Sequence, residues 1–249
     1  MYISNYLNEK ETMKKLLGII GISTLLMGCE SIIGIQGEGE AIMKEIVVDA
    51  PITAIDLETS ANVYLTQVEN EQSIEVHGQE NIIDLLRTNV EDGEWEIDFK
   101  QSVAKREPLE IYISVKDLSK VEIDGSGNIE LLTTFQSEKS FDLEIEGSGN
   151  FEGDINTEKL MVAIDGSGEV VLSGSAKEVD YEIEGSGNIH AETLLGQQAT
   201  IDISGSGDVY TQIESNMVVD ISGSGNVYYL GTPKVEAEIS GSGKVMALD

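Results

Sequence analysis

The sequence predicts an all-β protein folded as a single-stranded parallel β-helix with about 18–22 residues in each coil. The main observation is a Gly-Ser-Gly tripeptide that occurs seven times in the second half of the chain, at intervals of 18–22 residues. Such a period, kept over many copies, is typical of solenoids. Aromatic residues make up only 5% of the chain and glycines number 26, which favours thin stacked strands over a globular core. A right-handed helix is favoured because parallel crossovers are nearly always right-handed, and a left-handed hexapeptide-type helix is the alternative.

The residues around each tripeptide predict the core. When the first glycine is position zero, position −2 is isoleucine in all seven copies: Ile123, Ile145, Ile164, Ile183, Ile203, Ile221 and Ile239. Positions −4 and +4 are also apolar, and because strand residues alternate between faces, these columns should point inward while positions −3 and −1 point outward. A second turn is expected half a period later, as at Gly153-Asp154.

The glycines of the tripeptide are expected to form a tight turn. Glycine adopts positive φ freely and allows a close backbone approach that a Cβ would block. The turn-forming glycines are Gly125, Gly127, Gly147, Gly149, Gly166, Gly168, Gly185, Gly187, Gly205, Gly207, Gly223, Gly225, Gly241 and Gly243. The chain from 121 to 249 is therefore predicted to form seven regular repeats.

The N-terminal segment predicts export. Lys14 and Lys15 precede the apolar run 16–27, which is too short to span a bilayer as a mature helix. The sequence Leu26-Met27-Gly28-Cys29 resembles the lipobox of bacterial lipoproteins, in which the cysteine is acylated. We expect a signal peptide over 1–28, in which translation starts at Met13 and residues 1–12 are an upstream extension. The lipid on Cys29 would then bind the protein to the membrane, and residues 29–45 would form the tether. An ordinary signal peptide with an incidental cysteine is the alternative.

The pattern of the segment 46–120 predicts irregular β-helix coils with an insertion around 81–108. Residues 55–63 align with 121–129, and residues 74–82 align with the same motif again. Within the insertion, residues 82–87 predict a short helix and 91–94 a hairpin turn. Terminal repeats are often atypical because they cap the stack.

The charge of the chain limits its partners. The formal net charge is −31, and residues 121–249 contain 24 acidic residues against five lysines. Nucleic acid is therefore not expected as a partner, because phosphate binding needs clustered lysine and arginine.

The acidic residues at position −1 form a column that must face solvent or hold cations. Stacked like charges repel by roughly 1 kcal/mol per neighbouring pair in bulk water. Calcium prefers carboxylate oxygens, although the repeat lacks the Gly-Gly-x-Gly-x-Asp pattern of calcium β-rolls. The alternatives are a solvated acidic face without any cofactor and a Ca²⁺ ladder whose metal ligands would be Asp124, Glu146, Asp165 and Glu184.

Other repeated positions have structural interpretations. Position +3, mostly asparagine, predicts a turn residue or a ladder of side-chain amides. Tyr210 and Tyr228 share one outward column and predict either a packing pair or a platform for carbohydrate. The seven equivalent serines have only His190 as a histidine within the regular repeats, so no catalytic residue is assigned and no enzyme is expected.

The strings Asp124-Gly125-Ser126-Gly127-Asn128-Ile129 and 184–189, downstream of the lipobox, resemble the head GIN domain of auto-transporter adhesins. The resemblance covers about 47–249 and implies a β-helical, surface-associated, non-enzymatic protein of Gram-negative bacteria. The leading hypothesis is an envelope lipoprotein of the outer membrane, facing the surface or the periplasm, that acts in adhesion towards a glycan or host-surface ligand or as a scaffold. The alternatives are a polysaccharide-binding or polysaccharide-processing β-helix and a cation-dependent structural module. The last coil would leave an exposed edge. We therefore expect either a homo-oligomer that forms through this coil end or a cap supplied by the insertion.

Overall fold

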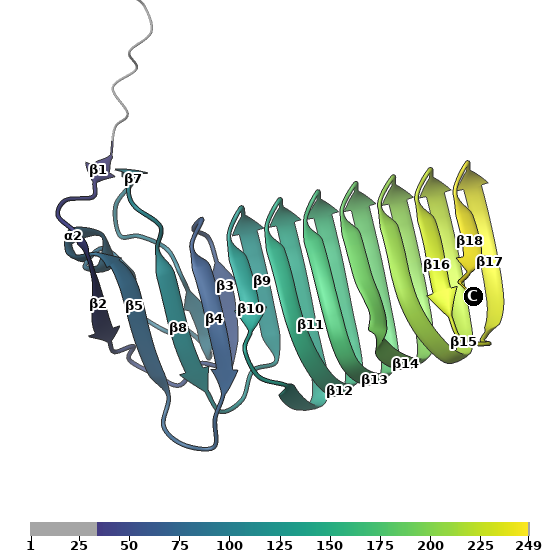
Figure 1. The fold of residues 1–249 in the computed structure, drawn as a ribbon, viewed down its shortest axis with the longest axis horizontal. Coiled ribbons are helices and arrows are strands. Elements are labelled where there is room, and N and C mark those ends of the chain that lie inside the picture. Colours follow the sequence, from purple (N-terminus) through teal and green to yellow (C-terminus); the bar gives the residue numbers. More distant parts are fainter. Residues whose placement is uncertain (1–33, 249) are drawn as a thin grey trace, which may run out of the picture. The chain divides into compact units, whose positions relative to one another are not determined.

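A computed structural model describes residues 34–248, and residues from Ile35 onward form one compact unit (Figure 1). The predicted signal peptide and Cys29 lie outside the described residues. The prediction of an all-β parallel β-helix is confirmed, since consecutive coils of the second half pair in parallel along most of their length, with register shifts at a few positions.

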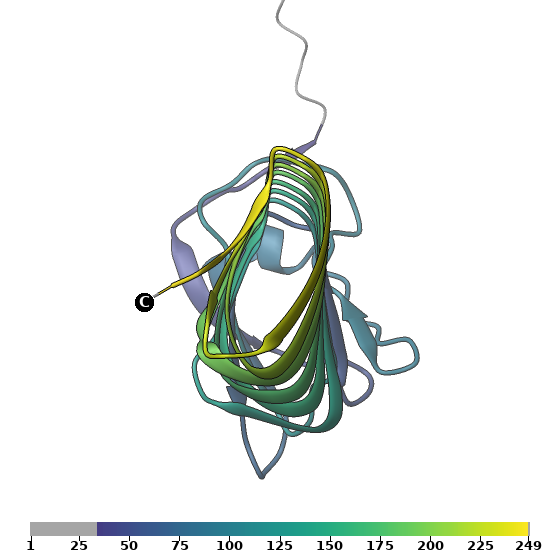
Figure 2. The same cartoon turned by 90° about the vertical axis from the view of Figure 1, so that its right-hand side faces the viewer.

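The regular stack begins with β9 (Lys120–Gly125) and β10 (Asn128–Leu131). The following strands are β11 (Phe135–Gly147), β12 (Asn150–Gly166), β13 (Glu169–Gly185), β14 (Asn188–Gly205), β15 (Asp208–Gly223), β16 (Asn226–Leu230), β17 (Lys234–Gly241) and β18 (Lys244–Ala247). The strand before each Gly-Ser-Gly ends at its first glycine, and the next strand begins directly after the second. The tripeptide therefore forms the turn at one narrow end of a flattened coil (Figure 2). The turn expected at Gly153-Asp154 is instead part of β12, where pairing with β13 continues through the bend. A bend that keeps its ladder hydrogen bonds leaves no buried backbone group unpaired.

The predicted core columns are buried through the sixth Gly-Ser-Gly copy. Ile123, Ile183 and Ile221 have no exposed side-chain surface, and position −4 includes the fully buried Tyr181. In the last coil, Ile239 is 42% exposed, because no further coil of the described chain covers it.

The tripeptides stack directly on one another, which explains their composition. A Cβ on Gly205, whose φ is +145°, would lie 2.1 Å from the carbonyl oxygen of Gly185. A Cβ on Gly207 would lie 2.1 Å from the carbonyl oxygen of Gly187. The Ser206 amide donates to the same Gly185 oxygen at 2.7 Å, so the close approach is part of the coil-to-coil hydrogen bonding.

The first half supplies two further coils in an order that differs from the chain order. β3 (Ala54–Leu57) pairs with β9, and β4 (Asn62–Gln67) pairs with β10. Ile55 lies opposite Val121 and Val63 opposite Ile129, so the first predicted degenerate repeat is confirmed. On their other side, β3 pairs with β6 (Glu94–Glu96) and β4 with β8 (Glu110–Val115). The coil at 54–67 thus lies between a later coil and the regular stack.

Antiparallel strands end the parallel stack at its N-terminal side. β5 (Ser73–Gln79) is antiparallel to β8 and to β2 (Ala41–Ile46). The expected second degenerate repeat at 74–82 is therefore wrong. Its apolar alternation fits an antiparallel strand equally well, since period two sets the faces and not the direction of a strand.

Smaller elements complete this end. β1 (Ile35–Gln36) pairs with β7 (Val103–Lys105), so residues we expected in a tether belong to the folded unit. The helix expected at 82–87 is α2 (Glu80–Ile83). The hairpin turn at 91–94 is confirmed by the two hydrogen bonds between the backbones of Glu91 and Glu94, and Asp92 and Gly93 both have positive φ.

Candidate ligand-binding face

One outward column crosses the whole sheet that follows the Gly-Ser-Gly turns. It corresponds to position +5, and register places its members opposite one another on successive strands. In stacking order they are Tyr112, Tyr64, Glu130, Glu152, Val171, His190, Tyr210, Tyr228 and Met246. The column therefore has two groups of aromatic residues with smaller side chains between them, and it ends at Met246 in the last coil.

The aromatic residues form two ring stacks. Tyr64 and Tyr112 have ring centroids 4.9 Å apart and ring planes 18° apart. His190 and Tyr210 are 4.9 Å apart at 10°, and Tyr210 and Tyr228 are 4.7 Å apart at 9°. The predicted pairing of Tyr210 with Tyr228 is present, and both faces of Tyr210 have a ring beside them. The carbohydrate platform at this pair stays a prediction.

Sequence reasoning missed three members of these stacks. The alignment of 55–63 with 121–129 places Tyr64 at position +5, so that signal was available. His190 occupies the same position in its own repeat. Tyr112 had no such signal, because its strand follows β4 by more than forty residues yet pairs directly with it.

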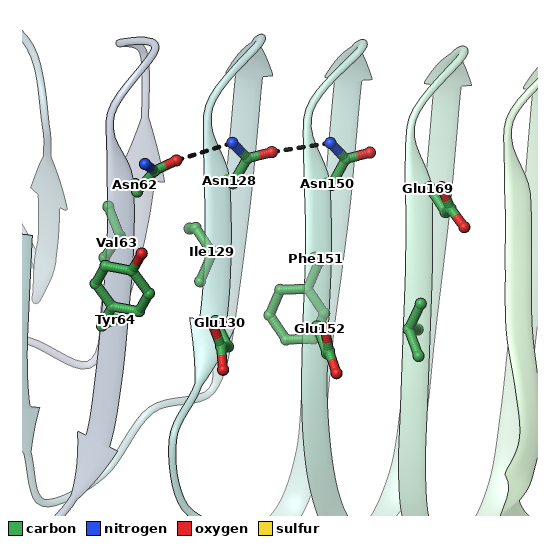
Figure 3. A pocket seen from close by; sticks show the side chains of 11 residues that line it. Asn62, Val63, Tyr64, Asn128, Ile129, Glu130, Asn150, Phe151, Glu152 and Glu169 are labelled. Atoms are coloured by element: carbon green, nitrogen blue, oxygen red, sulfur yellow. Dashed lines mark hydrogen bonds between the residues drawn. The ribbon is translucent and has the colours of Figure 1, made fainter. Parts of the chain in front are cut away.

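A ladder of side-chain amides runs beside the column at position +3, as predicted (Figure 3). Asn128 donates through Nδ2 to Oδ1 of Asn62 at 2.9 Å, and Asn150 donates in the same way to Asn128 at 2.8 Å. Asn226 donates to Asp208 at 2.8 Å further along the stack. These bonds fix the side chains that border the column.

A groove of about 310 Å³ lies on this face over β4, β10, β12 and β13. Tyr64, Glu130, Glu152 and Val171 line it together with the amide ladder. Val171 is 37% exposed, and both glutamates are exposed. The groove thus offers carboxylates, amides and the rim of an aromatic ring.

The predicted cation column lies in register on the other side of the turn. Asp124, Glu146, Asp165 and Glu184 are all exposed and sit opposite one another on successive strands. Within residues 34–248, the one group of three acidic side chains with oxygens within 4.8 Å of one another is Glu58, Glu96 and Asp98. Calcium binding by the predicted column stays a prediction.

A second acidic cluster surrounds Asp56. Burial, together with the negative charges of Glu122, Glu58, Glu94 and Glu96, raises the pKa of Asp56 to about 7. Lys120 partly balances the cluster, with Nζ 2.6 Å from Glu122 and 3.2 Å from Glu94. Hydrogen bonding to Glu122 raises the pKa of Lys120. Asp56 Oδ1 is buried without a hydrogen-bond partner, so its ionisation opposes folding.

The family model described as "putative auto-transporter adhesin, head GIN domain" matches residues 51–233. The chain belongs to this family. The resemblance expected from the Gly-Ser-Gly strings is therefore confirmed.

Solved structures share the fold of this head GIN domain protein. A putative adhesin from Bacteroides fragilis has a TM-score of 0.80 and 24% identity, covering 86% of this chain and 100% of that chain. A putative adhesin from Parabacteroides distasonis has a TM-score of 0.73 and 25% identity over 86% and 99% of the two chains. A protein from the same organism described as a putative lipid binding protein has a TM-score of 0.67 and 24% identity over the same shares. A search of curated proteins found no similar sequence.

The histidines of this head GIN domain protein contact carboxylates. His190 Nε2 is 3.6 Å from Glu169, and His77 Nδ1 is 3.4 Å from Glu110. Within residues 34–248, no hydroxyl of a Gly-Ser-Gly serine is hydrogen-bonded to either histidine, so no serine nucleophile is paired with a base there. Among the same residues, no helix has the length and apolar character needed to cross a bilayer.

Proposed function

We propose that this protein is a non-enzymatic adhesion protein, held on the outer membrane by acyl chains on Cys29 and displayed on the cell surface. The description of its family and the adhesin-like neighbours support a role in adhesion. The single cysteine at the end of a signal-like segment supports the lipid anchor. Two or three acyl chains hold a protein on a membrane stably, whereas one chain does not.

The observation that carries the proposal is the continuous outward column of β8 to β16. Parallel stacking repeats the same surface position on each successive strand, roughly 4.8 Å apart, so an extended ligand meets equivalent groups at regular intervals. Continuous parallel ladders hold these groups at fixed positions, which lowers the entropic cost of binding at several points at once. Such a surface suits attachment better than catalysis, which requires a precisely assembled and desolvated site.

Attachment of cells tests the proposal. We expect a strain lacking the gene to adhere less than its parent to glycan-coated and matrix-coated surfaces, and the full gene to restore adhesion. A gene carrying Cys29→Ser should yield a folded protein that no longer restores it, because the anchor is lost. Unchanged adhesion in the deletion strain on every surface would contradict the proposal.

A further inference from the structure

The position +5 column contains a gap between its two ring stacks. Glu130, Glu152 and Val171 occupy three successive strands there, and all three side chains are smaller than the rings on either side. The register from Tyr64 to His190 spans four strand spacings, roughly 19 Å. We call this stretch, lined by Glu130, Glu152 and Val171 and ended by Tyr64 and His190, the notch.

The ends of the notch are aromatic. Tyr112 covers one face of Tyr64, and Tyr210 covers one face of His190. The next side chain in register on the other side is Glu130 for Tyr64 and Val171 for His190. Neither of these is a ring, so each stack presents its terminal ring towards the notch. Figure 3 shows Tyr64 beside Glu130 and Glu152 on three neighbouring strands.

The floor of the notch is acidic and uncompensated. Glu130 and Glu152 lie opposite each other on adjacent strands, and within residues 34–248 neither forms an ion pair or a hydrogen bond. The amide ladder of Asn62, Asn128 and Asn150 runs along one side and supplies further donors and acceptors. Two neighbouring carboxylates on a protein of net charge −31 repel anions and attract cations.

We propose that the notch binds a linear glycan that carries free amino groups. A sugar ring packs its apolar face on Tyr64, its ammonium groups pair with Glu130 and Glu152, and its hydroxyls bond to the asparagine amides. Stacking and charge pairing on successive strands let one chain run along the stack. The inference rests on the proposed adhesive function and names the site and ligand class for it.

A pair of probes that differ only in charge tests the ligand class. A short linear oligomer of glucosamine and its fully N-acetylated counterpart share the sugar backbone, but only the first is cationic at about pH 6. We expect calorimetric titration of the purified protein to detect the glucosamine oligomer, with an affinity at least about tenfold above that of the N-acetylated oligomer. Raising the salt from about 0.05 M to 0.5 M should weaken binding of the first probe. Equal affinity for both probes, or no binding of the first, would overturn the proposal.

Variants test the location. Glu130→Gln combined with Glu152→Gln keeps side-chain size and should weaken binding of the glucosamine oligomer at least about tenfold. Tyr64→Leu keeps an apolar side chain but removes the ring, and should weaken binding about fivefold. The matched control is Asp202→Asn combined with Asp220→Asn, which neutralises two exposed carboxylates on adjacent strands before the turn. The control should bind the glucosamine oligomer as tightly as the wild type does. An equal loss of affinity in the glutamate double variant and in the control would show that net charge causes the effect, and it would overturn the notch.

An oligolysine peptide distinguishes the other cationic occupant. If it bound as tightly as the glucosamine oligomer and Tyr64→Leu left both affinities unchanged, the surface would be a basic-peptide site and the proposal would be wrong.

Failure of the site and failure of the adhesive role are distinguishable. Loss of adhesion in the deletion strain with wild-type binding by the Glu130→Gln and Glu152→Gln variant would refute the notch alone. Tight, variant-sensitive binding with unchanged cell adhesion would refute the adhesive role alone.

Discussion

Three glycine-to-alanine variants separate the two demands that coil stacking makes on the Gly-Ser-Gly turn. Gly125 has a φ of +117° but open space around the position of a Cβ. Gly207 does not have a positive φ of this kind, yet its Cβ would lie 2.1 Å from the Gly187 oxygen. Gly205 combines a φ of +145° with a Cβ position 2.1 Å from the Gly185 oxygen. The first variant tests backbone conformation, the second tests contact with the previous coil, and the third tests both.

The expected losses in free energy of unfolding follow from these contacts. Positive φ at a non-glycine residue costs about 1–2 kcal/mol, so Gly125→Ala should lose about that much. Forcing a methyl group against a backbone oxygen costs at least as much as ordinary overpacking, so Gly207→Ala should lose about 2–4 kcal/mol. Gly205→Ala should lose about 3–6 kcal/mol, because both costs apply.

Urea unfolding followed by far-UV circular dichroism measures the three losses. The tryptophan fluorescence of Trp95, buried at the opposite end of the stack, reports whether the first-half coils unfold together with the altered coil. Equal losses for all three variants, or the largest loss for Gly125→Ala, would refute the explanation by coil contact.

Three further outcomes follow from the structure. Asp56→Asn should stabilise the protein at about pH 8 by about 1–2 kcal/mol after allowance for solvent, because the folded-state pKa of Asp56 is raised from 3.8 to about 7 and its ionisation opposes folding. The gain should shrink as pH falls below about 7 and should be lost below the unfolded-state pKa of 3.8, because the aspartate is then protonated in both states, and a gain that is constant with pH would contradict this cause. A chelator should leave the melting temperature unchanged, since the column from Asp124 to Glu184 is exposed on each strand, and a fall would instead assign a structural cation. Prolonged incubation should leave the glucosamine oligomer at full length by mass spectrometry, and shortened products would show an enzyme.

Strict periodicity made the regular coils predictable from the sequence. Ile123 and its equivalents recur at a fixed distance from each tripeptide, so alternation assigns their faces, and the structure buries all of them except Ile239 in the last coil. The first degenerate repeat was found for the same reason, since Ile55 and Val63 keep their spacing despite the loss of both glycines.

The first half could be predicted only in part because alternation does not encode strand direction or stacking order. β5 has the pattern of a repeat but runs antiparallel, and the coil containing β8 stacks outside an earlier one. These pairings depend on contacts between distant residues, and no local signal reports them. The ring beside Tyr64 was missed for this reason, since Tyr112 meets Tyr64 only through that exchanged order.

Protease treatment of intact cells tests the surface display of the protein most directly. An epitope tag inserted in the exposed loop near Asn70 would mark the folded unit, and a periplasmic protein would serve as the control for an intact envelope. We expect added protease to remove the tag from intact cells while the periplasmic control survives. Protection of the tag until the outer membrane is opened would contradict surface display and with it the adhesive function.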